Sequence, residues 1–296
     1  MIVGSGITGL RAAVEASTTN QNVLVISKGP RCSWGIGGFN APIHKNDSTE
    51  LYYQDILKSG CGLSDTGLAK ILAANSIEEV RFLERSGMIF DHTSNGDYDL
   101  LKPLGCSVPR LVHRGTQTGS MAETIFMNIL RSRNVEIRET VTALDIISDG
   151  QKVYGVTGIE NGRELVCYLA KSVIMAAGGC GHMYAVSTYP AGIQGDSYGM
   201  MIRAGCEMID MEFMQFEPCC LTEPAQLRGR GISTTMLTAG AVIRNPSGEE
   251  FLHKYFPDLS LVQKSELSRA IYAESQKYGG APLEYDLTMF SREELF

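Results

Sequence analysis

The sequence predicts an α/β protein that begins with a Rossmann-like dinucleotide-binding domain. Two observations carry this prediction. The chain opens with a short apolar stretch at 1–3, a Gly4-x-Gly6-x-x-Gly9 turn and an Ala-rich helix start. A continuous apolar run follows at 22–26, as expected of a buried parallel strand. Strand, turn, helix and strand together form one βαβ unit, which is the building block of a doubly wound parallel sheet.

Each glycine of the opening turn has a separate physical role. Gly4 permits the tight turn after the strand, and Gly6 removes a side chain so that backbone N–H groups can reach a pyrophosphate. Gly9 lets the helix pack closely on the strand, with its positive N-terminal end toward the phosphates. Because glycine triplets also occur by chance, the alternative interpretation is a tight turn without a ligand.

The remaining elements alternate along the chain. Residues 48 to about 90 are expected to be helical, with apolar positions spaced by three and four and a stop at Gly87. A further helix, a strand, three antiparallel strands and a last buried strand are predicted at about 120–133, 135–138, 141–147, 152–159, 164–169 and 172–177. The turn signals Asp149-Gly150 and Asn161-Gly162 separate the antiparallel strands.

Composition excludes several classes of function. The chain has 296 residues, 44% of them hydrophobic and 20% charged, which is typical of a globular protein with a large core. A net charge of −7 disfavours nucleic acid and anionic membranes as partners, and no apolar run is long enough for direct membrane insertion. Eight scattered Cys residues without a Cys-x-x-Cys pair indicate a cytoplasmic protein without a zinc or iron–sulfur site of its own.

Three further glycine-rich segments narrow the ligand. The segment 35–40 follows the second strand, the segment 176–181 ends the last buried strand, and the segment 195–199, which contains Asp196, lies before a helix start. The first could be only a flexible loop. Asp196 could be an N-cap or could bind a ribose or ribityl hydroxyl. The second strand ends in Ser27-Lys28 rather than in the acidic residue of a simple NAD enzyme, which argues against NAD.

In this order, the segments resemble the flavoprotein subunit of succinate dehydrogenase and fumarate reductase, with L-aspartate oxidase and adenylylsulfate reductase as relatives. The resemblance runs over nearly the whole chain, through residues 4–13, 27–28, 37–38, 118–119, 177–181, 195–196, 203–216, 245–251 and 285–287. It implies FAD as the cofactor. The positions that it assigns to FAD binding are Gly4, Gly6, Ile7, Thr8, Gly9, Ser27, Lys28, Arg31, Cys32, Ser33, Gly37, Gly38, Ala143, Ala177, Gly178, Gly179 and Asp196.

Several positions depart from the family pattern. Members often carry a His before the Gly-Gly loop that links covalently to FAD, and the matching position here is Arg31, so non-covalent FAD is expected. A substrate-binding His of the family corresponds to Glu217, and a proton-donating Arg corresponds to Lys264. Where the family has Thr-Glu, this chain has Thr238-Ala239.

Lys264, Thr238 and Glu217 are therefore the candidate catalytic residues. For Lys264 the alternative is a solvated helix residue, and for Glu217 it is a structural carboxylate with a satisfied charge. An unpaired Glu217 would repel a dicarboxylate substrate unless one of the carboxylates were protonated. Succinate or fumarate itself is thus not the expected substrate.

The sequence predicts an FAD-binding domain over 1–213 with a helical insertion at about 48–110. An α+β capping or substrate domain is expected over 214–296, and it is incomplete by comparison with the family. The expected function is an FAD-dependent oxidoreductase that transfers hydride between flavin N5 and an organic substrate, such as an unsaturated acid. The alternatives are a degenerate subunit with only an electron-relay or structural role and, last, a nicotinamide dehydrogenase. An iron–sulfur subunit is the partner that the resemblance implies, and through it a place at the inner face of a membrane.

Overall fold

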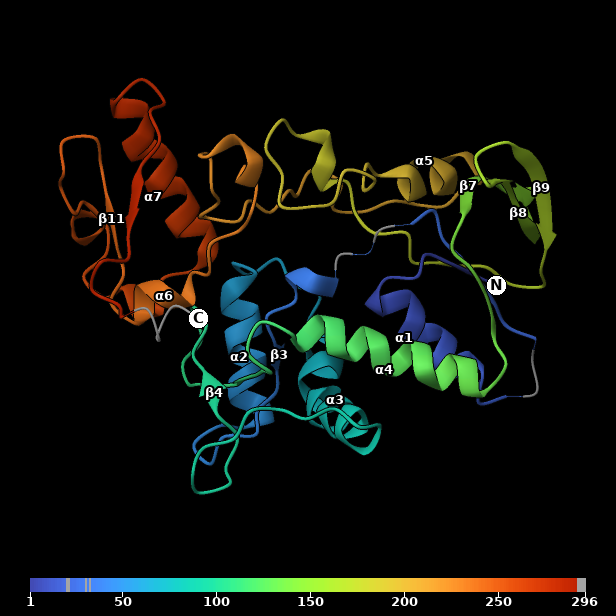
Figure 1. Cartoon of the computed structure of the whole chain (residues 1–296), viewed down its shortest axis with the longest axis horizontal. Helices are drawn as coiled ribbons and strands as arrows, with labels where there is room; N and C mark the ends of the chain where they lie inside the picture. Colours follow the sequence, from blue (N-terminus) through green and yellow to red (C-terminus); the bar gives the residue numbers. More distant parts are fainter. Residues whose placement is uncertain (20–21, 30, 32, 292–296) are drawn as a thin grey trace. The chain divides into compact units, whose positions relative to one another are not determined.

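The computed structural model describes residues 1–19, 22–29, 31 and 33–291, which form two compact units. The first unit comprises 1–37, 83–89 and 114–213, and the second comprises 38–82, 90–113 and 214–296. Figure 1 shows their helices and strands along the chain. Each unit combines helices with small sheets, so the predicted mixing of helix and strand is observed.

The first unit is built on a parallel sheet with the strand order β10-β1-β2-β6. Its strands are β1 (Ile2–Val3), β2 (Leu24–Ile26), β6 (Glu136–Arg138) and β10 (Ile174–Met175). Ile2 lies opposite both Val25 and Ile174, so β1 is the inner strand between β2 and β10. The helix α1 (Ile7–Ala16) connects β1 to β2 and completes the βαβ unit.

Helix α1 packs beside α4 (Thr118–Ser132) in the first unit, as Figure 1 shows. Leu10, Ala13 and Val14 are buried on α1, because apolar residues recur there at the spacing of one helix face. On α4 the buried side chains are Ala122, Ile125, Phe126, Met127 and Leu130. The Arg133 guanidinium fixes the pair by donating hydrogen bonds of 2.8 Å to the Val14 carbonyl and the Ser17 hydroxyl.

An antiparallel meander completes the first unit and corresponds closely to the predicted strands. It consists of β7 (Val141–Ser148), β8 (Val153–Glu160) and β9 (Glu164–Leu169). Val141 and Val156 of the meander form one apolar cluster with Val3 and Ile26 of the parallel sheet. Helix α5 (Asp196–Arg203) packs against β7. The meander and α5 are thereby fixed at the sheet on which the opening glycine turn lies.

The predicted helix over 48–90 is two helices, α2 (Thr49–Ser59) and α3 (Thr66–Arg85). The chain leaves α2 through Cys61 at φ 51° and Gly62 at φ 81°, a left-handed conformation that interrupts a helix. Asp65 then accepts a hydrogen bond from the Leu68 N–H and starts α3. Apolar spacing alone did not reveal this break because Gly60 and Gly62 lie between two segments of similar periodicity.

The second unit contains two small antiparallel sheets, β3-β5-β4 and β11-β12. Their strands are β3 (Phe39–Asn40), β4 (Leu100–Leu101), β5 (Leu111–Val112), β11 (Val242–Arg244) and β12 (Glu284–Asp286). The helices α6 (Thr235–Thr238) and α7 (Lys264–Lys277) share a hydrophobic core with the sheet β11-β12. The core of this part comprises Leu104, Cys219, Leu237, Ala241, Ile243, Phe251, Leu252, Val262 and Leu267.

Candidate functional site

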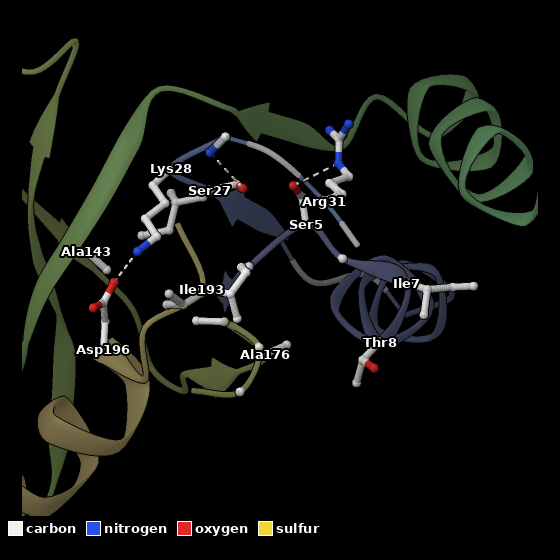
Figure 2. A pocket seen from close by; sticks show the side chains of 18 of the residues that line it. Ser5, Ile7, Thr8, Ser27, Lys28, Arg31, Ala143, Ala176, Ile193 and Asp196 are labelled. Carbon is white, nitrogen blue, oxygen red and sulfur yellow. Dashed lines mark hydrogen bonds and ion pairs between the residues drawn. The ribbon is translucent and has the colours of Figure 1, made fainter. Parts of the chain in front are cut away.

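A cavity opens in the first unit where the parallel strands end and the glycine turn begins (Figure 2). It has a volume of about 230 Å³ and opens to solvent. That is slightly below the range of about 300–1,000 Å³ for small-molecule and cofactor sites. Its lining includes predicted FAD-binding residues from well-separated segments, namely Gly4, Gly6, Ile7, Thr8, Ser27, Lys28, Arg31, Ser33, Ala143, Ala177, Gly178, Gly179 and Asp196.

The glycines of the opening turn have different steric surroundings. Gly4 has φ 107°, and a Cβ there would lie 2.2 Å from the Ala176 carbonyl oxygen. A Cβ on Gly9 would lie 2.0 Å from the Gly4 carbonyl oxygen, so this glycine allows α1 to pack on the turn. Among the residues that the structure describes, a Cβ on Gly6 would meet no atom within 4 Å. Gly6 borders the open cavity, where a bulky ligand can approach the backbone closely.

The N-terminus of α1 is suited to an anion. Gly6 is the N-cap, no side chain caps the helix, and its first turn contains no acidic residue. The first helical hydrogen bond runs from the Leu10 N–H to the Gly6 carbonyl, so the preceding N–H groups of the turn have no partner within the helix. Unpaired N–H groups and the positive end of the helix dipole together favour a phosphate group. The residues present therefore fit the pyrophosphate of a dinucleotide.

An ion pair between Lys28 and Asp196 lies in the same cavity (Figure 2). Lys28 follows β2, and Asp196 is the first residue of α5, 168 positions further along the chain. Gly195 precedes Asp196 at φ 86°, a left-handed conformation that glycine adopts without strain. The carboxylate that the sequence lacks directly after β2 is thus brought there by a distant segment, next to where a ribose lies in such folds.

Arg31 is held beside the glycine turn by a network of polar side chains. Its Nε donates to the Ser5 Oγ at 3.0 Å, and its Nη1 donates to Glu123 Oε1 at 2.9 Å (Figure 2 shows the contact with Ser5). Glu139 accepts from the other guanidinium nitrogen, and Ser33 donates to Glu123. The fork of Arg31 therefore fixes the turn between β1 and α1 to helix α4.

Three of the predicted FAD-binding residues, Gly9, Gly37 and Gly38, do not line this cavity. Gly9 acts in packing, as described above. Gly37 lies in the segment that α4 holds, because the Thr118 Oγ1 donates to its carbonyl at 2.8 Å. Gly38 lies in the second unit, where a Cβ would meet the Leu111 side chain at 2.6 Å. Cys32 is outside the residues that the structure describes.

Sequence reasoning missed several residues of the site. Glu123 and Glu139 were missed because the charges that Arg31 meets come from α4 and from the start of the meander. Further lining residues that it did not name are Val3, Ser5, Ile26, Gly29, Ile36, Val141, Ala176, Tyr189, Ile193 and Met200. Ser5 could have been inferred from its position inside the glycine turn. Nothing in the local sequence marks Tyr189 or Met200.

In the second unit, the structure brings two of the candidate catalytic residues together. The Lys264 Nζ donates to both carboxylate oxygens of Glu217, at 3.0 and 3.2 Å. Lys264 begins α7, and the Ser268 hydroxyl one turn later donates to the Phe216 carbonyl at 3.0 Å. The first turns of α7 therefore hold the segment that carries Glu217. The charge of Glu217 is compensated, which removes the repulsion expected for an unpaired carboxylate.

The surroundings of this pair contain a thiol but not the third candidate. Burial, followed by the negative charge of Glu217, raises the pKa of Cys219 to about 12, so the thiol is neutral at physiological pH. Thr238 is exposed at the end of α6, and its hydroxyl donates to the Thr235 carbonyl at 2.8 Å. Within the described part of the chain, no hydrogen bond or ion pair joins Thr238 to Glu217 or Lys264.

Metal-binding clusters and membrane-spanning helices are absent from the residues that the structure describes. No cluster of three or more His, Cys, Asp or Glu side chains is arranged to hold a metal ion in the ranges given above. Over the same ranges, no helix combines the length and apolar character needed to cross a membrane.

The parallel sheet, the glycine turn and the uncapped α1 N-terminus define a dinucleotide-binding α/β fold. The family described as "FAD binding domain" matches residues 1–294. The chain belongs to this family of flavoproteins, which includes relatives named as fumarate reductase and L-aspartate oxidase. The expectation of FAD rather than NAD as the cofactor is thereby confirmed.

Relatives at about 30% identity cover nearly the whole chain. One subunit of the fumarate reductase (CoM/CoB) of Methanothermobacter marburgensis is 30% identical over 93% of this chain and 52% of its own length. L-aspartate oxidase of Vibrio cholerae is 30% identical over 97% of this chain and 57% of its own length. The chain thus spans about half the length of the curated relatives that it matches.

Solved structures share the fold. A mutant FrdA of Escherichia coli quinol fumarate reductase superposes with a TM-score of 0.91 at 24% identity, over 99% of this chain and 54% of that chain. The Mycobacterium smegmatis Sdh1 complex in its apo form gives a TM-score of 0.80 at 26% identity, over 99% of this chain and 52% of that chain. The resemblance expected from the sequence motifs is confirmed.

Proposed function

We propose that the protein is an FAD-dependent oxidoreductase that acts on an organic substrate of the unsaturated-acid type. The observation that carries this proposal is the cavity of the first unit, where the glycine turn, the α1 N-terminus and the Lys28–Asp196 pair converge. The relatives named as fumarate reductase and L-aspartate oxidase support the reaction class. When bound, FAD supplies hydride transfer at flavin N5.

The residues of the first unit bind and orient the cofactor. The backbone at Gly6 and the first turn of α1 receive the pyrophosphate, since the N–H groups before Leu10 have no partner within the helix and its first turn contains no acidic residue. Lys28 and Asp196 offer a cation and a carboxylate at the carboxyl end of the sheet, where Asp196 accepts from a ribose hydroxyl.

The cofactor is held without a covalent bond. An Arg side chain cannot form the covalent bond to FAD that a His forms in many members of the family. In this structure, the Arg31 guanidinium is engaged by Ser5, Glu123 and Glu139. The role of Arg31 is to fix the glycine turn. The affinity for FAD then depends on the non-covalent contacts of the cavity.

The residues of the second unit act on the substrate. Lys264 is the proton donor in this proposal, and Glu217 holds the ammonium group through two hydrogen bonds. Pairing leaves the two groups with no net charge between them, so the pair selects against a second substrate carboxylate less strongly than a lone Glu217 would. The exposed hydroxyl of Thr238 serves as a substrate contact.

A redox partner accepts or supplies the electrons. An iron–sulfur subunit is the proposed partner, because the chain resembles flavoprotein subunits of respiratory-type complexes, and one matched structure is itself named as a complex. Such a partner would place the protein at the inner face of a membrane. A relay or structural role without substrate chemistry is not favoured, because the curated relatives are named as enzymes.

Purified protein tests the proposal in two stages. Acid precipitation should release the yellow flavin into the supernatant, and flavin retained in the precipitate would contradict non-covalent binding. Reduced protein should then turn over one of a panel of enoates that includes fumarate. Lys264→Ala should lower kcat by about 10²- to 10⁴-fold without loss of FAD, as expected for removal of a general acid.

A second ion pair of the same unit provides the matched control. Lys254 pairs with Glu249 at 2.5 Å and is half exposed, like Lys264. Lys254→Ala should leave kcat within about twofold, because it removes an exposed charge outside the proposed site. Equal losses in Lys254→Ala and Lys264→Ala, or full activity in Lys264→Ala, would remove Lys264 from the proposed chemistry.

A further inference from the structure

A closed surface loop borders the FAD cavity in the first unit. It begins at Cys180, beyond the glycine segment that follows β10, and reaches α5 at Gly195. The Gly195 N–H donates to the Gly179 carbonyl at 3.0 Å, and the His182 N–H donates to the Ile193 carbonyl at 3.0 Å. These two bonds join the ends of the segment 180–195, which makes it a compact Ω-type loop.

Two side chains of this loop form part of the cavity wall, Tyr189 and Ile193. Ile193 lies over Gly178, since a Cβ on that glycine would be 3.3 Å from the Ile193 Cγ2. The Tyr189 ring occupies the space beside Gly181, where a Cβ would be 2.4 Å from the ring Cδ2. Glycine at 181 therefore makes room for an aromatic ring at the cavity.

The Tyr189 ring is not buried in the core of the unit. The residue is 43% exposed although it lines a cavity. A partly exposed aromatic ring at a nucleotide cavity can stack on a base. Such stacking contributes substantially to the affinity for the nucleotide.

The loop lies at the adenosine side of the cavity. A Cβ on Gly192 would be 3.6 Å from the Lys28 Cε, so the loop reaches the residue that follows β2. In βαβ dinucleotide sites the ribose next to the adenine lies at the end of this second strand. Figure 2 shows Ile193 in the same cavity as Lys28, Asp196 and Ala143.

We infer that Tyr189 is an FAD-binding residue whose ring stacks on the adenine of the cofactor. Ala143 and Met200 provide apolar surface in the same cavity, as a planar base requires. Gly181 is the positioning residue for the ring, because any side chain there would displace it. The loop 180–195 thus helps to retain a cofactor that has no covalent link.

Binding of ADP to the FAD-free chain of residues 1–296, measured by isothermal titration calorimetry, tests this inference. ADP contains the adenosine and pyrophosphate part of FAD and has no redox chemistry, so the result does not depend on the proposed reaction. Tyr189→Ala should weaken ADP and FAD binding by the same factor, between about 5-fold and about 150-fold. Tyr189→Phe should stay within about twofold, because it retains the ring.

Two further variants sharpen the experiment. Gly181→Ala keeps the tyrosine but displaces its ring, and it should weaken ADP binding in the same direction as Tyr189→Ala. Tyr184→Ala is the matched control, since Tyr184 belongs to the same loop, is also 43% exposed and does not line the cavity. Circular dichroism should show that all variants remain folded.

The inference fails on any of three results. Unchanged or tighter ADP binding by Tyr189→Ala would show that the ring does not contact the adenosine part. A loss for FAD without a loss for ADP would place the ring on the flavin part instead. An equal loss in Tyr184→Ala would attribute the effect to the loop as a whole.

Discussion

The two units of the chain form their sites from different materials. In the first unit, the part of the cavity at the glycine turn depends on backbone groups, with glycines whose missing side chains leave open space at Gly6 and room for a packed helix at Gly9. In the second unit, the Glu217–Lys264 pair and a buried cluster around Arg110 depend on ionised side chains. A backbone site is disturbed by adding an atom, whereas an ion-pair site is disturbed by removing a charge.

This difference explains why the cofactor site of the first unit is easier to predict from the sequence than the Glu217–Lys264 pair of the second unit. Backbone N–H groups are present at every non-proline residue, so only glycine positions and local conformation specify a phosphate site. Charged pairs depend on partners that are distant in sequence, such as the 47 positions between Glu217 and Lys264. The predictions below test this difference between the two units.

The largest effect on stability is expected at Arg110. Its side chain is fully buried, and its Nη2 contacts Asp55 Oδ2 at 2.8 Å and Asp47 Oδ1 at 3.2 Å, with the Tyr52 ring 4.7 Å from the guanidinium carbon. Arg110→Met leaves two carboxylates without their counterion. The free energy of unfolding should fall by about 3–5 kcal/mol in urea denaturation.

The pH dependence of Arg110→Met provides a second measurement. Burial raises the pKa of Asp47 above its ordinary value, while Arg110 opposes that rise. The folded chain therefore binds the proton more tightly than the unfolded chain, so stability increases as the pH falls from the folded pKa toward the unfolded value of about 3.9. The difference in the free energy of unfolding between the wild type and Arg110→Met should become smaller on acidification. A difference that became larger would contradict this account.

An exposed arginine of the first unit is the control for Arg110. Arg138 pairs with Glu136 at 2.6 Å and with Glu160 at 3.3 Å, and both Arg138 and Glu136 are partly exposed to solvent. Arg138→Met should cost no more than about 1 kcal/mol, because solvent screens exposed ion pairs. A cost equal to that of Arg110→Met would remove the distinction between buried and exposed charge.

A smaller effect is expected for the Glu217–Lys264 pair. Both side chains are partly exposed, so a double-mutant cycle with Glu217→Gln and Lys264→Met should give a coupling free energy of about 0.2–1 kcal/mol. The coupling should decrease in 1 M salt, where charges are screened over about 3 Å. A coupling of zero at low salt would mean that the pair does not persist in solution.

Local signals account for the part of the fold that the sequence predicted. Local sequence patterns predict the turn Gly4–Gly9, the helix around Ala122 and the meander with its Asp149-Gly150 turn. The structure has the corresponding helices and strands at these positions. The helix over 48–90 was interpreted incorrectly at Gly60–Gly62, because the hydrophobic spacing continues on both sides of the break.

Long-range pairing accounts for the part that the sequence could not predict. Lys28 and Asp196 were each named as FAD-binding residues, but their ion pair depends on a contact across 168 positions. Arg31 was predicted as an FAD-binding residue at the position of the family's His, but its contacts with Glu123 and Glu139 were not predicted. Which acid meets which base is decided by the tertiary packing of α4 and the meander.

In the proposed function the backbone at Gly6 receives the cofactor, and a single substitution at this position tests that role. Gly6→Ala adds a Cβ at an ordinary φ of −66°, and no atom of the described residues lies within 4 Å of it. The matched variant Gly9→Ala adds a Cβ that lies 2.0 Å from the Gly4 carbonyl oxygen. The two variants therefore separate loss of the ligand from loss of packing.

The measurement is FAD affinity together with the free energy of unfolding of the FAD-free chain. Gly6→Ala should weaken FAD binding at least about tenfold while stability stays within about 0.5 kcal/mol. Gly9→Ala should itself destabilise the FAD-free chain by about 1–3 kcal/mol. Wild-type FAD affinity in a folded Gly6→Ala variant would contradict the claim that the cofactor approaches the chain at this turn.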